Sequence, residues 1–315
     1  MKKILFIGIG KEANQKQRMT SALVKSGAAY VYVKWSDLAF IGNKVYAQAQ
    51  ELDLREIGVV FFDIPRFSVN TKFFGGRRKE TEFHLENELQ VLLTILKEKN
   101  IYALNRDFFL KYPYYNKFSQ TYIFESNGVA SIPTVHLSDN KQRKLLEFFN
   151  SANFYFPLVA KESYGARGSK VWKIADQAML TAFIAERRNV SVVFQPFIEN
   201  DADYRVIVVG GKCLGIMKRS AQGGEWKNNF SLGGEVARHE DEEMKKFAIE
   251  ACQKMKLDIA GLDIFSTPTG FLVIEANLFF GLDGFESVFE ELDVSAEIVK
   301  MLVAKLEEDN GQESF

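Results

Sequence analysis

The polar residues that stand out most clearly lie in two apolar segments toward the C-terminal end of the chain. Residues 261–265 are apolar except for Asp263, and residues 271–277 are apolar as far as Glu275. Between them, residues 266–270 (Ser-Thr-Pro-Thr-Gly) are typical of a turn. The pattern therefore predicts a β-hairpin with one carboxylate on each strand.

The register of this hairpin decides what the carboxylates can do. If Phe265 pairs with Phe271, Asp263 and Glu275 are diagonal neighbours on one face, and Asn277 continues that face. Two carboxylates and an amide oxygen are ligands that Mg²⁺ accepts together with nucleotide phosphates. The alternative is that both carboxylates form ion pairs with nearby lysine or arginine side chains, because an unpaired buried charge is costly.

A second candidate site follows the strand-like segment 156–161. Lys161 ends this segment, and Ser163, Gly165 and Gly168 lie in the loop that comes next. Glycine and serine let backbone N–H groups approach an anion closely, and a lysine at the strand end adds a positive charge to the same phosphate. The spacing differs from that of a Walker P-loop, whose lysine follows the glycines. A plain hairpin loop without a ligand is the alternative.

An apolar segment with a proline occupies residues 193–199 (Val-Phe-Gln-Pro-Phe-Ile-Glu). Such a segment suits a hinge whose backbone binds an adenine, because proline ends a strand and leaves a free edge. For the segment taken alone, an ordinary strand followed by a turn is the better explanation.

A further hairpin is predicted around Gly210-Gly211, a two-residue turn between two β-rich segments. If the strands pair directly on both sides of this turn, Asp203 lies opposite Lys218. On that register Arg219 points to the other face, unless a bulge intervenes.

The elements that must position these residues belong to more than one structural unit. In the first hundred residues, strand-like and helix-like segments alternate, which predicts a parallel-sheet α/β domain. A boundary is expected near residues 111–115, followed by a helix over 117–127 that ends at Gly128. From about Asn140 to residue 280, strand pairs with glycine turns are expected to dominate. The segments of the first domain are strands near 4–9, 30–34 and 59–64 and helices near 16–25 and 82–99.

Composition excludes several classes of protein. The 315 residues include 40 Lys and Arg against 41 Asp and Glu, a net charge of −1, so no nucleic-acid partner held by overall basicity is expected. Two cysteines, Cys213 and Cys252, cannot form a disulfide framework and suit a reducing compartment. No apolar stretch approaches the roughly 20 residues that span a membrane. We expect a cytoplasmic protein without a signal peptide or a membrane partner.

Taken in order, these segments resemble the ATP-grasp superfamily, and within it the branch of RimK-type α-L-glutamate ligases and glutathione synthetase-like ligases. The resemblance covers about residues 105–300 and is most specific from Asp263 through residues 275–277 to residues 281–286 (Gly-Leu-Asp-Gly-Phe-Glu). It implies an α/β (α+β) fold in which an N-terminal Rossmann-like pre-ATP-grasp domain precedes two α+β subdomains that clasp ATP. The implied boundaries are 1–112 for the first domain, 113–192 for the central lid subdomain and 193–315 for the catalytic subdomain.

The resemblance also implies roles for individual residues. Lys117 and Lys161 match the two lysines that contact nucleotide phosphates, and Ser163, Gly165 and Gly168 belong to the lid loop above them. The adenine hinge matches Gln195, Pro196, Phe197 and Ile198, and Asp203 takes the ribose position. Arg219, Lys227 and Asn229 match groups that steady the transferred phosphoryl group, and Asp263, Glu275 and Asn277 match the Mg²⁺ ligands.

The activity implied by the resemblance is ATP-dependent ligation of a carboxylate to an amine through an acylphosphate. One or two Mg²⁺ ions, replaceable by Mn²⁺, are implied, with glutamate or another amino acid as one substrate and a metabolite or peptide as the other. Homo-oligomers are common among similar proteins. Two alternatives stay open: an ATP-binding regulatory module without ligase activity, and a small-molecule kinase on the same fold. This chain departs from its relatives at Leu278-Phe279-Phe280, which suggests an acceptor pocket more apolar than usual.

Overall fold

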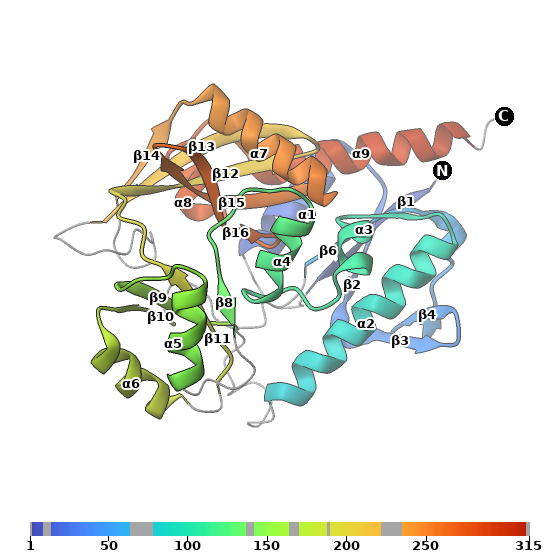
Figure 1. The fold of residues 1–315 in the computed structure, drawn as a ribbon. Coiled ribbons are helices and arrows are strands. Elements are labelled where there is room, and N and C mark those ends of the chain that lie inside the picture. Colours follow the sequence, from blue (N-terminus) through green and yellow to red (C-terminus); the bar gives the residue numbers. More distant parts are fainter. Residues whose placement is uncertain are drawn as a thin grey trace.

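The computed structural model of the chain describes residues 2–8, 14–63, 78–136, 142–163, 170–187, 190–221 and 235–312. Its strands form three larger sheets and one small one, and helices cover the larger sheets (Figure 1). Within the described residues, no helix is both long enough and apolar enough to cross a membrane.

The first sheet is parallel and has the strand order β2-β1-β6-β7. The apolar runs of the sequence become its central strands, β1 and β6, which are buried on both faces as expected for a parallel sheet. The predicted parallel sheet is therefore confirmed. The strands are β1 (Lys3–Gly8), β2 (Tyr30–Lys34), β6 (Ile57–Phe62) and β7 (Tyr102–Ala103).

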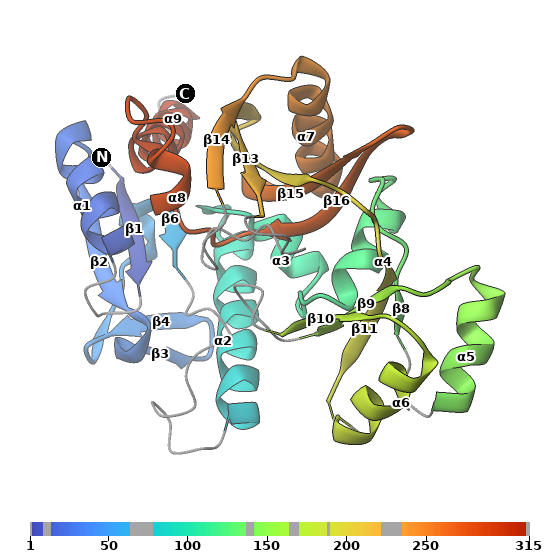
Figure 2. The same cartoon turned by 90° about the vertical axis from the view of Figure 1, so that its left-hand side faces the viewer.

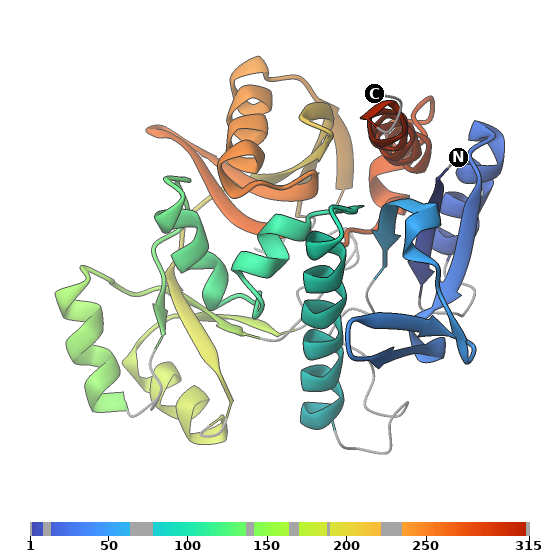
Figure 3. The same ribbon diagram turned by 90° about the vertical axis from the view of Figure 1, so that its right-hand side faces the viewer.

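Helices cover both faces of this sheet (Figures 2 and 3). On one face, Leu92 and Leu96 of a long helix pack in the same core as Leu5 and Val60. On the other, the first helix and the last helix of the chain pack around Phe6. The helices are α1 (Asn14–Ser26), α2 (Arg78–Glu98), α3 (Arg106–Lys111) and α9 (Val294–Gln312).

A small antiparallel meander, which the sequence analysis did not predict, follows β2. It consists of β3 (Leu38–Ile41), β4 (Lys44–Ala47) and β5 (Gln50–Glu51), flanked by the 3₁₀ turns η1 (Trp35–Asp37) and η2 (Leu54–Glu56). Val45 from the meander is fully buried against the core of the first sheet.

The second sheet is antiparallel, with the order β10-β9-β11-β8, and carries two helices over its own small core (Figure 1). The glycine turns of the sequence predicted strand pairs here, and neither helix was predicted. One signal was present, because Asp176 accepts a hydrogen bond from the backbone N–H of Met179 and so caps the second helix. The elements are β8 (Val135–His136), α5 (Gln142–Ser151), β9 (Leu158–Glu162), β10 (Val171–Ile174), α6 (Gln177–Glu186) and β11 (Val192–Pro196).

The third sheet is antiparallel and contains both predicted hairpins, in the order β14-β13-β12-β15-β16. Helix α7 covers it and was also missed, although Asp241 caps it by accepting a hydrogen bond from Met244 N–H. A short helix, α8 (Asp283–Glu286), follows the sheet. The elements of the sheet are β12 (Ala202–Val209), β13 (Lys212–Ser220), β14 (Glu235–His239), α7 (Glu242–Met255), β15 (Ile259–Thr267) and β16 (Gly270–Asn277).

The last helix, α9, completes the core of the first sheet. Leu302 is fully buried in a cluster that includes Ile4 and Phe61. The same helix is tied to the start of the chain, because Lys2 Nζ lies 3.1 Å from Asp309 Oδ2. The fold of the N-terminal unit therefore depends on a C-terminal segment.

We predict that Leu302→Ala lowers the free energy of unfolding by about 2–5 kcal/mol, because it opens a cavity in this shared core. Urea unfolding followed by circular dichroism measures the change. Lys300→Ala on the exposed side of α9 is the control and should change the free energy of unfolding by less than about 0.5 kcal/mol. Equal effects of the two substitutions would show that α9 does not complete the core.

Candidate functional site

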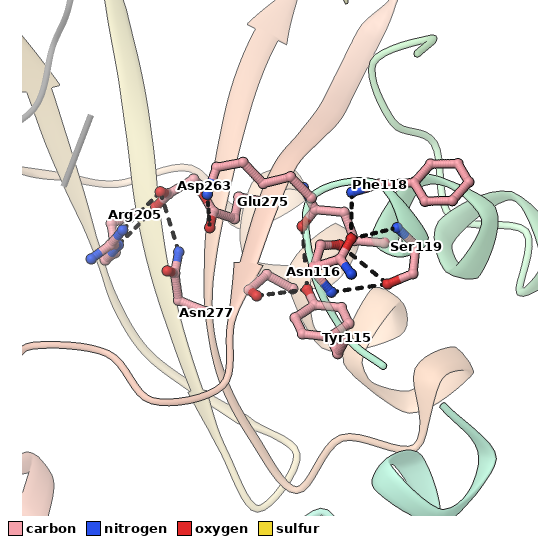
Figure 4. A network of polar contacts seen from close by, with 11 residues as sticks. Tyr115, Asn116, Phe118, Ser119, Arg205, Asp263, Glu275 and Asn277 are labelled. Carbon is pink, nitrogen blue, oxygen red and sulfur yellow. Dashed lines mark hydrogen bonds and ion pairs between the residues drawn. The ribbon is translucent and has the colours of Figure 1, made fainter. Parts of the chain in front are cut away.

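The candidate site lies where the second and third sheets meet the start of helix α4 (Ser119–Ser126) (Figure 4). Residues 115–117 precede this helix and contact both sheets. The backbone N–H of Lys117 donates a 3.2 Å hydrogen bond to the carbonyl of Ser163, just beyond β9. Lys117 Nζ lies 3.2 Å from Glu275 Oε1 on β16. A single lysine thus joins the two sheets.

The backbone around Lys117 is held by a reciprocal cap at the helix start. Asn116 Oδ1 accepts hydrogen bonds from Phe118 N–H at 2.9 Å and from Ser119 N–H at 3.1 Å. The Ser119 hydroxyl in turn accepts a 2.9 Å bond from Asn116 N–H. The short polar side chains satisfy N–H groups that have no partner within the helix. The lysine therefore projects from a fixed backbone.

The β15–β16 hairpin brings its polar residues closer together than the sequence analysis expected. Asp263 lies directly opposite Glu275, not diagonally, and Phe265 pairs with Leu272 instead of Phe271. The cause is an irregularity in the register between Asp263 and Ile264, which shifts one strand by a residue. Asn277 Nδ2 donates a long, 3.4 Å hydrogen bond to Asp263 Oδ2.

The predicted register of the β12–β13 hairpin is wrong in a similar way. A register shift between Ile207 and Val208 places Arg219, not Lys218, opposite Asp203. The sequence left open a bulge that would bring Arg219 to the face of Asp203, and such a bulge is present. Arg219 Nε donates a short hydrogen bond to Asp203, and the Arg219 side chain is almost fully buried.

Arg205 completes a buried group of four charges. It lies opposite Asp263 and contacts that carboxylate through two hydrogen bonds of 2.7 Å. Arg219 Nη2 lies 3.2 Å from the same carboxylate. The alternative that the carboxylates pair with basic side chains therefore describes Asp263, through two arginines, and Glu275, through Lys117.

These pairs set the protonation state of Asp263. Burial alone would raise the pKa of the Asp263 carboxyl, but the guanidinium groups of Arg205 and Arg219 lower it to about 2. The carboxylate is therefore ionised at neutral pH, as a metal ligand must be.

The donor atoms of this hairpin are of the kind that a hard divalent cation binds. Two carboxylates and an amide oxygen from neighbouring positions of one hairpin are the oxygen ligands that Mg²⁺ prefers. In the described part of the chain, no three acidic, histidine or cysteine side chains lie together as a complete metal site. An ion held by Asp263, Glu275 and Asn277 would therefore need oxygens from a bound ligand, such as phosphate.

Lys161, near the end of β9, is half-buried, and its ammonium group lies close to the same carboxylates. Burial lowers its pKa to about 8, although the nearby charges of Glu275 and Asp263 act in the opposite direction. A lysine held in such surroundings destabilises the fold at neutral pH, which is characteristic of a functional cation.

The remaining predicted residues lie at opposite ends of the antiparallel pair of strands β9 and β11. Ser163 is buried, and its hydroxyl lies 2.7 Å from that of Ser191. Gln195 is buried, and its side-chain amide donates a 2.9 Å hydrogen bond to Thr134 Oγ1. Pro196 ends β11, Phe197 N–H donates to the Pro157 carbonyl at 3.1 Å, and Ile198 is half-buried.

Four predicted residues, Gly165, Gly168, Lys227 and Asn229, lie outside the described residues. The apolar stretch 278–280, expected near an acceptor pocket, is mostly buried. Leu278 and Phe280 are buried, and Phe279 stacks on Phe109 with ring centroids 5.9 Å apart.

Two residues of the site were not identified from the sequence. Arg205 could have been found, because it is two positions from Asp203 and strand side chains at that spacing share a face. Tyr115 gave no such signal, since its hydroxyl donates to the Ala276 carbonyl far along the chain.

The charges of the site do not cancel. The four cations and three carboxylates leave one positive charge, which favours an anionic ligand. They are Lys117, Lys161, Arg205 and Arg219, and Asp203, Asp263 and Glu275.

Comparisons with known proteins agree with this geometry. Residues 115–302 match the family model of the RimK-like ATP-grasp domain. A probable alpha-L-glutamate ligase of Aeromonas salmonicida is 36% identical over 162 residues, which cover 49% of this chain and 53% of that protein. A probable alpha-L-glutamate ligase of Alcanivorax borkumensis is 36% identical over 46% of this chain and 50% of its own length. The matches thus span about half the length of these curated relatives.

Solved structures are similar over nearly the whole chain. The ATP-grasp ligase PsnB, complexed with a phosphomimetic variant of its minimal precursor, Mg and ADP, has a TM-score of 0.70 at 16% identity, over 97% of this chain and 99% of PsnB. The macrocyclase MdnC of Microcystis aeruginosa, bound with precursor peptide MdnA, has a TM-score of 0.66 at 14% identity, over 96% of this chain and 99% of MdnC. The expected ATP-grasp fold is confirmed.

We predict that Asp263 makes stability depend on acid pH. Its pKa of about 2 lies below the ordinary value of 3.8, so its ionised form stabilises the folded state. That contribution, on the order of 2–3 kcal/mol, is present above about pH 4 and is lost as the pH falls toward 2. In urea unfolding, the free energies of unfolding of the unaltered chain and of Asp263→Asn should approach each other as the pH falls over this range.

The control for this titration is Asp201→Asn, which changes an exposed carboxylate. It should give the same small difference at every pH. A difference between the unaltered chain and Asp263→Asn that stays constant from pH 5 to pH 2 would contradict the assignment.

We predict that Lys161→Met stabilises the protein at pH 7. The lowered pKa of about 8 means that the folded state disfavours the charged lysine. In the unaltered chain this penalty is full below pH 8 and is relieved as the pH rises from 8 toward 10.5, so the substitution should add on the order of 1–3 kcal/mol at pH 7 and little at pH 10. Thermal unfolding at both pH values, with exposed Lys212→Met as the control, tests this; a destabilised Lys161→Met variant would refute it.

Proposed function

Because the chain belongs to the RimK-like ATP-grasp family, we propose that it is a ligase that uses Mg·ATP to join a carboxylate to an amine and releases ADP and phosphate. The observation that supports this most directly is the contact between Lys117 and Glu275, which lie 158 positions apart in the sequence. It puts a predicted phosphate-binding lysine beside a predicted metal ligand. A lysine on the phosphates and a carboxylate that holds the metal recur in enzymes that transfer a phosphoryl group from a nucleoside triphosphate.

The proposed reaction has two steps. A carboxylate oxygen of the first substrate attacks the γ-phosphorus of ATP, the bond to the bridging oxygen breaks, and ADP leaves with the electron pair. The amine nitrogen of the second substrate then attacks the acylphosphate carbon. A C–N bond forms, the C–O bond to phosphate breaks, and the amine proton passes to solvent. The work of the protein is to neutralise and position charge, and no side-chain nucleophile takes part.

Each predicted residue has a place in this scheme. Lys117 and Lys161 neutralise phosphate oxygens, while the backbone of the hinge from Gln195 through Pro196 and Phe197 to Ile198 receives adenine. Asp203 takes the ribose, and Arg219 with Lys227 and Asn229 steadies the transferred phosphoryl group. The loop with Ser163, Gly165 and Gly168 covers the phosphates and excludes water, which would hydrolyse an acylphosphate.

The metal would be held by Asp263, Glu275 and Asn277. When bound, Mg²⁺ shields the phosphate oxygens and aligns them for transfer. Arg205 and Arg219 would keep the Asp263 carboxylate ionised and in place for that role.

We propose an amino acid, with glutamate as the first candidate, as one substrate, and a small molecule or peptide as the other. The names of the curated relatives support glutamate. The precursor peptides bound by PsnB and MdnC support a peptide partner.

The test is release of phosphate and ADP from Mg·ATP in the presence of amino acids and acidic peptides, singly and in pairs, with mass spectrometry of the products. Glu275→Gln should reduce substrate-dependent phosphate release by at least about 100-fold, because it removes the negative charge that pairs with Lys117 and would hold the metal. Exposed Glu290→Gln is the matched control and should keep full activity.

The products separate this proposal from its alternatives. An amide together with equal amounts of ADP and phosphate supports the ligase. A stable phosphoester with ADP but no free phosphate would assign a kinase instead. Tight Mg·ATP binding without turnover on any member of the panel would favour a regulatory nucleotide-binding module.

A further inference from the structure

The strand that carries Glu275 and Asn277 lies at the edge of its sheet. In the described part of the chain, β16 pairs with β15 on one side and forms an isolated bridge, between Val273 and Ser131, on the other. Its pairing with β15 is irregular, because Val273 pairs with Ile264 and Glu275 with Asp263, so that Ile274 has no partner. A bulge at an edge loosens the ladder locally. The two proposed metal ligands therefore need support from outside the sheet.

That support comes from two contacts on the free side of β16. At Val273, the N–H donates to the Ala130 carbonyl at 2.9 Å, and the carbonyl accepts from Ile132 N–H at 3.4 Å. At Ala276, the carbonyl accepts a 2.7 Å hydrogen bond from the Tyr115 hydroxyl. The second contact falls between Glu275 and Asn277, so it holds the peptide group that links Ala276 to Asn277 (Figure 4).

Tyr115 is suited to this task because its own position is fixed. Its ring packs edge-on against Phe108, with centroids 5.3 Å apart. Its oxygen lies 3.3 Å from Gln120 Oε1 in helix α4, and Gln120 is buried. Burial and the charge of Glu275 raise the pKa of the hydroxyl well above its ordinary value, so the group keeps its proton and remains a donor.

We propose that Tyr115 is a positioning residue, whose hydroxyl holds Glu275 and Asn277 in the geometry that accepts the nucleotide-bound metal ion. This inference rests on the proposed function and adds a residue to it. Partners that orient metal ligands in this way typically change metal affinity by about 10–100-fold when they are removed.

The hydroxyl acts on the metal ligands and not on Lys117. The lysine backbone is held separately, by the Asn116 cap and by the bond from Lys117 N–H to the Ser163 carbonyl. Loss of the Tyr115 hydroxyl should therefore loosen β16 at Ala276 and leave the phosphate-binding lysine in place. Nucleotide binding without metal should be preserved.

The test compares ADP binding with and without Mn²⁺, measured by isothermal titration calorimetry on the full chain. We expect Tyr115→Phe to weaken ADP binding about 10-fold when Mn²⁺ is present and less than about 2-fold in EDTA. The phenylalanine keeps the ring and its contact with Phe108. A purely structural role would lower the free energy of unfolding without changing the ratio of the two dissociation constants.

Tyr112→Phe is the matched control. Tyr112 also packs on Phe108, with centroids 5.3 Å apart, but its hydroxyl accepts a 2.8 Å hydrogen bond from Asn127 Nδ2 at the far end of α4. This variant should be destabilised by a similar amount, and Mn²⁺ should tighten its ADP binding as much as it does for the unaltered chain.

Two outcomes would overturn the inference while leaving the ligase proposal intact. In the first, Tyr115→Phe shows the same effect of Mn²⁺ as the unaltered chain. In the second, it weakens ADP binding equally with and without the metal. If Mn²⁺ fails to tighten ADP binding to the unaltered chain, the proposed metal site itself is wrong.

Discussion

The burial of opposite charges side by side is the interaction on which the rest of this structure depends. Arg205, Arg219, Asp203 and Asp263 lie on three adjacent strands, and each is bonded to at least one group of opposite sign. Such charges are tolerated away from water only while their partners stay in place. The central strands of the third sheet, and the two register shifts within it, are therefore parts of the site as well as of the fold.

The segment 115–117 connects this group of four charges to the second sheet. Tyr115 contacts the backbone of β16, Lys117 contacts Glu275, and the N–H of Lys117 bonds to Ser163 beyond β9. Three consecutive residues thus set the relation between the lysine-bearing sheet and the carboxylate-bearing sheet. A ligand that bridges the sheets would meet groups that are already aligned, which lowers the cost of organising the site on binding.

The sequence was sufficient for features encoded within one or two neighbouring segments. The parallel strands, helix α1 and both hairpins follow from hydrophobic pattern and turn residues. The registers of the hairpins were wrong because a bulge depends on packing and on edge contacts, which no local pattern records. Helices α6 and α7 were missed although Asp176 and Asp241 are readable caps, because glycine-rich surroundings favoured strands. Tyr115 could not be found, since its partner lies 161 positions away.

The packing of α9 against the first sheet also determines when this protein can finish folding. Strands β1 and β6 are made early in synthesis, whereas Leu302 and Ile298, which cover one of their faces, emerge only after all three large sheets have been translated. Until then the part of this apolar face that α1 does not cover stays exposed, and sheets whose contacts are distant in sequence form slowly. The nascent chain should therefore rely on chaperones, and its N-terminal unit should acquire native protection from hydrogen exchange only when the last helix has docked.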